Sequence, residues 1–123
     1  MAMTQSKMGL VNTEGSLWRF VETGTANTAL TASVPAMGGP FRVLLVTVAY
    51  SAAPTQAGVT TTLNSGAGAG YDATLNTGSA NALYTTYEPT TDLIVGSDDA
   101  VDVTAPAGGA GITASVAVYL QKM

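Results

Sequence analysis

The sequence contains no cysteine and no histidine. Thiolates and imidazoles are the usual nucleophiles, general bases and zinc or haem ligands, so their absence excludes most enzyme mechanisms and the common metal centres. Disulfide bonds are excluded as well, and stability must come from packing, β-sheet hydrogen bonds or assembly. No serine or threonine has a lysine partner in a recognisable spacing. The sequence therefore predicts a protein that is not an enzyme and requires no cofactor.

Charge is also scarce, because charged residues make up only 10% of the chain and the formal net charge is −4. The four cations are Lys7, Arg19, Arg42 and Lys122, which are far apart in the sequence. A nucleic-acid-binding surface needs a basic patch that neutralises several phosphates, so no nucleic-acid partner is expected. Most of the acids lie in residues 63–123, which makes the second half of the chain the acidic half.

Long hydrophobic runs are absent too. No stretch approaches the roughly 18 apolar residues of a membrane-spanning helix, and the start of the chain lacks the apolar core of a signal peptide. No membrane partner is expected. A chain of 123 residues is the size of a single domain, and it is long enough to bury a substantial core.

The longest nearly continuous apolar run is residues 41–50, which is rich in β-branched and aromatic residues and lies between Pro40 and Pro54. This composition predicts a central β-strand that is largely covered on both faces. Strict alternation assigns its residues to two faces. One face carries Phe41, Val43, Leu45, Thr47 and Ala49, and the other carries Arg42, Leu44, Val46, Val48 and Tyr50.

Other short β-patterns recur at fairly regular spacing, separated by glycine, proline and aspartate. They span residues 16–23, 28–34, 58–64, 71–75, 81–87, 92–96, 101–103 and 112–120. In the last of these, alternation places Val116, Val118 and Leu120 inward and Ser115, Ala117 and Tyr119 outward. Without a convincing helix, the pattern predicts an all-β fold. We expect an antiparallel β-sandwich or jelly roll of about eight strands over residues 16–123.

Residues 1–15 show no sustained periodicity and are predicted to form an extended N-terminal arm. Such an arm can become ordered on a partner surface, with Met8, Leu10 and Val11 as adaptable apolar contacts. Trp18 is the only tryptophan of the chain. A core or subunit-contact role is the favoured interpretation, and stacking on a sugar ring is the alternative.

Two further segments invite a chemical interpretation. Asp92, Asp98, Asp99 and Asp102 lie close together in sequence, and paired carboxylates can bind calcium or act as an acid and base. Their spacing does not match the Asp-x-Asp-x-Asp-Gly calcium loop, so aspartates that bond the backbone of turns are expected instead, and no metal site is predicted. The Gly-Ala segment at residues 65–70 lacks the Lys-Ser/Thr of a phosphate-binding loop and is predicted to connect two strands.

The second half of the chain resembles small virion proteins of tailed bacteriophages. The resemblance is carried by Glu88-Pro89, by residues 93–96 and 99–109, and by residues 52–55 followed by 59–66. It implies a capsid decoration (cement) protein, which is a small, all-β, cysteine-free structural protein of the virion. Such a protein would lie on the capsid surface, contact the major capsid protein and stabilise the shell by bridging capsid subunits. The family also implies a homotrimer and a terminal extension that reaches a neighbouring subunit.

A second class of function is also open. The chain is alternatively a carbohydrate- or receptor-binding β-sandwich module of a phage tail or fibre. A sugar platform needs two or three coplanar exposed rings, whereas most of the aromatic residues fall within predicted strands. Binding to a glycan array would favour this class, and co-purification with intact capsids would favour a decoration protein.

Overall fold

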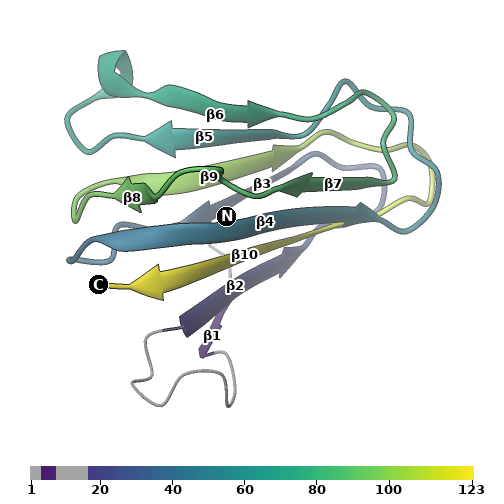
Figure 1. The fold of residues 1–123 in the computed structure, drawn as a ribbon. Helices are drawn as coiled ribbons and strands as arrows, with labels where there is room; N and C mark the ends of the chain where they lie inside the picture. The colour runs from purple at the N-terminus through teal and green to yellow at the C-terminus, as the bar shows by residue number, and fades with distance from the viewer. Residues whose placement is uncertain (1–3, 8–16) are drawn as a thin grey trace.

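The computed structural model describes residues 4–7 and 17–123, which contain ten strands and one short 3₁₀ turn, Ala69–Tyr71 (Figure 1). The strands are β1 (Thr4–Lys7), β2 (Leu17–Thr23), β3 (Leu30–Val34), β4 (Phe41–Tyr50), β5 (Thr60–Asn64), β6 (Ala73–Thr77), β7 (Tyr84–Tyr87), β8 (Leu93–Val95), β9 (Ala100–Ala105) and β10 (Ala114–Lys122). Over this part of the chain, no helix has the length and hydrophobicity needed to cross a membrane.

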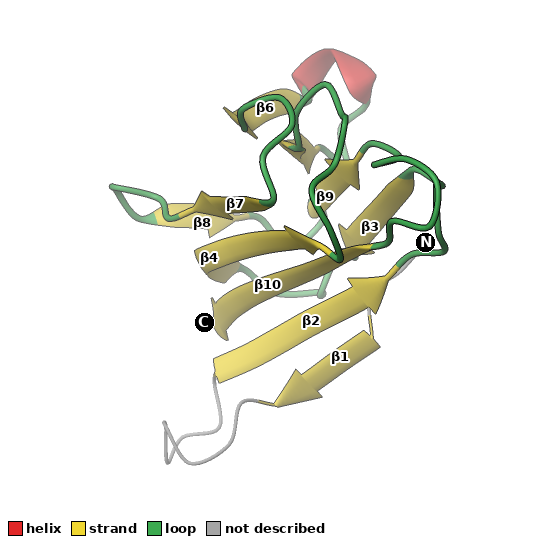
Figure 2. Ribbon diagram, turned by 90° about the vertical axis from the view of Figure 1, so that its right-hand side faces the viewer, coloured by secondary structure: helices red, strands yellow, loops and turns green. Residues whose placement is uncertain are grey.

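The strands form two antiparallel sheets in two layers (Figure 2). The larger sheet has the order β1-β2-β10-β4-β7, with β8 also paired to β4, and the smaller sheet has the order β3-β9-β5-β6. Early strands therefore pair with late ones: β2 with β10, β3 with β9, β4 with β7 and β8, and β5 with β6. A long antiparallel ribbon whose successive pairs alternate between two sheets is a jelly roll. The predicted all-β antiparallel sandwich is confirmed.

The core lies between the two sheets and consists mainly of valine. Strands β3, β9 and β10 contribute alternate residues to it, as the pleat requires. In β10, Val116, Val118 and Leu120 are buried, whereas Ser115, Ala117 and Tyr119 face outward, as alternation predicted. The largest fully buried side chains are Phe20, Val34, Phe41, Val46, Val48, Val59, Val95, Val101, Val103, Val116, Val118 and Leu120.

Strand β4 contains an extra residue that the alternation pattern did not reveal. Tyr119 of β10 pairs with Leu45, but the next residue of β10, Leu120, pairs with Val43. Leu44 is therefore a β-bulge, where two residues share one pairing position and the alternation of faces is reset. Strict alternation placed the buried residues before the bulge on one face of the strand and those after it on the other face. That assignment was wrong, because the bulge brings both groups to the core side. The buried residues of β4 are Phe41, Val43, Val46, Val48 and Tyr50.

Strand β1 lies within the segment that was predicted to be an arm without regular structure. It pairs antiparallel with β2 along its whole length, from Thr4 opposite Val21 to Lys7 opposite Trp18. The structure thus differs from the prediction at these four residues, which form one edge of the larger sheet. All four residues are polar, so they show no alternation of apolar and polar residues that would reveal a strand. Residues 1–3 and 8–16 are outside the described part.

Tyr50 gives the core a pH-dependent component. Its ring is buried, and its hydroxyl donates a hydrogen bond to the Pro106 carbonyl oxygen at 2.7 Å. Burial raises the pKa of this phenol above its ordinary value of about 10, because the phenolate would lose its hydration. Because the pKa of Tyr50 is higher in the folded state, the neutral, hydrogen-bonded phenol contributes its full stabilisation of the fold below pH about 10. This stabilisation is lost as the pH rises from there through the folded-state pKa.

We expect the melting temperature of the wild-type protein to fall more steeply above pH about 10 than that of Tyr50→Phe. At neutral pH the variant should be less stable by about 1 kcal/mol, the net value of one hydrogen bond. Thermal melts between pH about 8 and about 12 measure both effects. Tyr71→Phe, at an exposed ring, is the matched control. Parallel pH profiles for the wild type and Tyr50→Phe would contradict the expectation.

Candidate functional site

The outer face of the larger sheet, away from the core, carries apolar side chains interleaved with hydroxyl, amide and arginine side chains. The cross-strand registers place its outward residues in rows, for example Val21, Ala117, Thr47 and Thr86 across β2, β10, β4 and β7. We call this surface the outer sheet face. Its apolar members are Leu17, Val21, Leu45, Ala49, Tyr84, Ile94, Ala117 and Tyr119. Most are half-buried by their neighbours, while Tyr84 is 69% exposed and Ile94 is 44% exposed.

The charged positions of the outer sheet face are both arginines. Arg19 on β2 pairs across from Tyr119, and Arg42 on β4 pairs across from Ile94 and Gln121. Arg42 lies 3.6 Å from the exposed carboxylate of Asp92 at the margin of the face. Such a surface ion pair contributes little to stability, about 0 to 1 kcal/mol. The charged outward side chains of this face are therefore positive, although most of the acidic residues of the chain lie in residues 63–123.

The outer face of the smaller sheet is polar instead. One row crosses all four strands as Thr31, Thr104, Thr60 and Thr77. In the next row Asp102 accepts a hydrogen bond from Ser33 Oγ at 2.6 Å and from Asn64 Nδ2 at 3.1 Å. The two outer faces of the sandwich therefore differ in their content of apolar residues. The outer sheet face has more of them and is the candidate contact surface.

The residues predicted to contact a partner are not brought together in one site. Trp18 is half-buried on the inward side of β2, where it packs against the core cluster, and Lys122 Nζ lies 5.5 Å from the centre of its ring. This position agrees with the core interpretation and removes the indole from the outer sheet face. Met8, Leu10 and Val11 lie outside the described residues.

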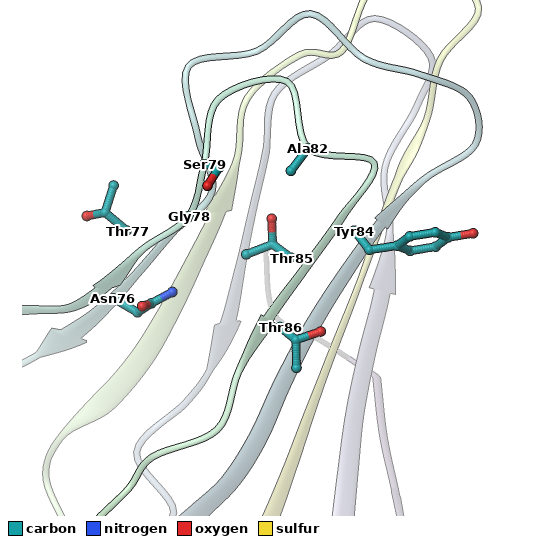
Figure 3. Close-up of a pocket in the computed structure, with 8 residues that line it drawn as sticks. All are labelled: Asn76, Thr77, Gly78, Ser79, Ala82, Tyr84, Thr85 and Thr86. Atoms are coloured by element: carbon teal, nitrogen blue, oxygen red, sulfur yellow. The ribbon is translucent and has the colours of Figure 1, made fainter.

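A cleft opens between β6 and β7, at one side edge of the sandwich (Figure 3). Its volume is about 280 Å³. On its floor the inward rows of the two sheets end in polar residues. These are Asn76, in register with Thr61 of β5, and Thr85, in register with Val48 of β4. The lining residues are Asn76, Thr77, Gly78, Ser79, Ala82, Tyr84, Thr85 and Thr86, and none of them is charged.

The upper wall of this cleft is held by a buried glutamine. Gln56 is only 6% exposed, and its Nε2 donates to the carbonyl oxygens of Ser79 and Ala82 at 3.5 and 3.4 Å. Its Oε1 accepts the backbone N–H of Gly58. Its backbone exchanges two hydrogen bonds with Asn81, one to Asn81 Oδ1 at 2.8 Å and one from Asn81 N at 2.9 Å. The turn at residues 78–82 is therefore fixed in place before any ligand arrives.

Two glycines permit this arrangement. Gly58 has φ +124°, and a Cβ there would lie 2.6 Å from the carbonyl oxygen of Gly78. A Cβ on Gly78 would lie 2.7 Å from Thr85 Cγ2. Gly58 combines a backbone conformation that favours glycine with a close approach to the backbone of Gly78, and Gly78 in turn leaves room for Thr85. The two walls of the cleft can therefore lie against each other without a side chain between them.

Replacing Gln56 with leucine is expected to destabilise the protein by about 1 to 3 kcal/mol. The change leaves buried backbone groups at Gly58, Ser79 and Ala82 without the partners they have now. Chemical denaturation measures the loss, and Gln121→Leu, at a half-buried glutamine on β10, is the control that should change stability by less than about 0.5 kcal/mol. Equal stabilities of the two variants would show that Gln56 does not hold the turn.

Asp99, one of the four clustered aspartates, and Asp72, which is not one of them, accept hydrogen bonds from a neighbouring loop. Asp99 Oδ1 accepts the backbone N–H of Gly66 at 2.9 Å, and Asp72 Oδ1 accepts that of Ser65 at 2.8 Å. These bonds tie the Gly-Ala connection to adjacent turns, in agreement with the turn interpretation of Asp99. Within residues 4–7 and 17–123, no group of three or more acidic side chains is arranged to hold a metal ion.

No protein-family model matches the chain, and no curated protein gives a significant sequence match. Two surfaces of the described structure are the candidate sites, namely the outer sheet face and the cleft between β6 and β7. Sequence reasoning missed both surfaces as sites. The only sequence signal for the cleft was indirect: a glutamine between Pro54 and Gly58 in a loop of otherwise small residues.

Proposed function

We propose that the chain is a structural virion protein, a capsid decoration protein of a tailed bacteriophage, that assembles through its outer sheet face. The observation that carries this proposal is the set of apolar side chains on that face, including the exposed Tyr84 and Ile94. Monomeric proteins rarely leave a large contiguous apolar surface exposed, and such surfaces typically mark contacts with other proteins. The jelly-roll fold and the phage-like segments between residues 52 and 109 support the same class.

The size of the outer sheet face indicates how much of a contact it supplies. Four strands spaced about 4.8 Å apart and about 25 Å long give an area on the order of 500 Å². A standard interface buries about 800 Å² on each partner. The face is therefore the centre of a contact to which neighbouring segments must add, and the N-terminal segment next to β2 is the adjacent one.

The distribution of charge favours a cyclic oligomer over a two-fold dimer. A two-fold axis places the same surface patch of each copy against itself, so two faces whose charged outward side chains are the arginines Arg19 and Arg42 would meet. A cyclic arrangement places the face against a different surface of the neighbour, such as the acidic half of the chain. We propose a homotrimer on the capsid surface, in contact with the major capsid protein.

Deleting residues 1–14 tests the attachment role of the N-terminal segment. We expect the jelly roll to persist, because β1 pairs only with β2 and the core lies between the other strands. Capsid binding should weaken, because the deletion removes Met8, Leu10 and Val11 together with the strand that covers the edge of β2. Co-sedimentation with capsids, and circular dichroism of both proteins, are the measurements.

The control is full-length protein with Met8, Leu10 and Val11 replaced by serine, which keeps β1. Equal capsid binding by all three proteins would remove the N-terminal segment from the proposal. A truncated protein that no longer folds would show that β1 is part of the folding unit. If full-length protein does not sediment with capsids at all, the proposal of a decoration protein is wrong.

A further inference from the structure

We propose that the cleft between β6 and β7 is a binding site for one ring of a neutral saccharide. The inference does not depend on the capsid role, although the cleft adjoins the outer sheet face and shares Tyr84 and Thr86 with it. Three observations lead to it: the chemistry of the lining, a buried hydroxyl without a partner, and a wall that is already rigid.

The lining matches a ligand that is polar but uncharged. Hydroxyl groups come from four residues other than tyrosine, an amide comes from Asn76, and Ala82 supplies a small apolar patch. Phosphates, carboxylates and metal ions all require countercharge, which none of the lining side chains provides. A sugar ring instead presents several hydroxyls at its rim and C–H groups on its faces, which fit such a mixed neutral lining.

Thr85 provides a specific anchor. Its Oγ1 is buried and has no hydrogen-bond partner among the described residues. In Figure 3 this hydroxyl points toward the space below Ser79 and Ala82, and the amide of Asn76 points toward it from β6. Buried polar groups without partners are rare and costly. This oxygen has almost no contact with solvent, so a ligand hydroxyl reaches it only when the Thr85 side chain rotates toward the cleft, and the new bond then breaks no existing one.

The geometry favours a single sugar ring over a peptide strand. β6 and β7 each have one unpaired edge within the described sheets, and a peptide could in principle add to either. However, β7 has only four residues, and the pairing of β6 with β5 is interrupted by a register shift. The volume of about 280 Å³ is at the lower limit of small-molecule pockets. The ring of Tyr84 points away from the other side chains, so stacking on it is not part of the site (Figure 3).

The test is a titration of ¹⁵N-labelled full-length protein with methyl glycosides of glucose, galactose, mannose and N-acetylglucosamine. We expect at least one glycoside to shift the amide signals of residues 76–79 and 82–86, with a Kd in the millimolar range. Thr85→Val removes the anchoring hydroxyl at nearly constant shape. It should weaken binding about five- to tenfold while leaving the melting temperature unchanged or higher, because the lost hydroxyl had no partner.

Two further variants complete the test. Ala82→Trp fills the cleft and should abolish binding, and Thr104→Val, a threonine on the outer face of the smaller sheet, should not affect it. No shift with any glycoside, or shifts confined to other surfaces, would overturn the proposal. Binding that Ala82→Trp and Thr85→Val leave unchanged would overturn it as well. Shifts in residues 76–86 with an extended neutral peptide, but with no glycoside, would assign the cleft to peptide recognition instead.

Discussion

Deleting one residue from each of two neighbouring strands is expected to have opposite results. Without Leu44 the protein should fold normally, and without Ala117 it should not. Leu44 is the extra residue of the β4 bulge, so its removal gives β4 and β10 an uninterrupted register with the same residues inward. Ala117 occupies a regular position of β10, which pairs continuously with β2.

The size of the second effect follows from the alternation of faces. A one-residue slip reverses every side chain on one side of the deletion. In β10 it turns Val118 and Leu120 outward, or else Ala114 and Val116, and it places polar neighbours in the core. Exposing each large apolar side chain costs about 1.5 to 3 kcal/mol, and burying a polar group adds to this. The total is comparable to the about 5 to 15 kcal/mol that stabilise a typical domain.

Circular dichroism, thermal melting and the dispersion of amide NMR signals distinguish the outcomes. Alanine itself contributes little to packing, so the loss in the Ala117 deletion reports on register and not on a missing contact. A Leu44 deletion that fails to fold would contradict the assignment of the bulge. A cooperative transition near the wild-type temperature in the Ala117 deletion would contradict the alternation of β10.

Ala117→Arg is expected to convert the assembled protein into a monomer of 12.3 kDa without unfolding it. Ala117 lies at the centre of the outer sheet face, between Val21 and Thr47 of the adjacent strands. An arginine there would force a long charged side chain into a contact that fits a methyl group, and overpacking together with loss of hydration would cost several kcal/mol. Since about 1.4 kcal/mol is a factor of ten in affinity, dissociation should increase by at least about a hundredfold.

Size-exclusion chromatography with light scattering at micromolar concentration measures the expected change in mass. The matched control is Thr104→Arg, which has the same central position in the smaller sheet, between Thr31 and Thr60. This control should remain oligomeric. A wild-type protein that is monomeric at this concentration, or an oligomer that only Thr104→Arg disrupts, would exclude the outer sheet face as the contact surface.

The sequence predicted the fold class because alternation and turn residues are local properties. The inward and outward residues of β10 follow from the alternation of residues along the strand, as do the opposite faces of Tyr84 and Tyr87 in β7. The bulge in β4 could not be predicted, because Leu44 and Leu45 are both apolar and either can face either side. The cleft depends on Asn76, Thr85 and Gln56, which come from separate segments. Their proximity is a consequence of the strand order, which no local pattern encodes.

The position of β10 has a consequence for how the protein is made. The ribosome releases residues 114–122 after all the other strands described, yet these residues form the strand between β2 and β4 in the larger sheet. Until they emerge, β2 and β4 have no neighbour on the sides that β10 will occupy. The larger sheet is then incomplete, and its apolar residues cannot all pack against the smaller sheet. Pairing between strands that are far apart in the sequence, such as β2 and β10, closes long loops and is intrinsically slow. The nascent chain therefore passes through a stage with unpaired strand edges, during which binding of a chaperone or early association with another copy would protect it from aggregation.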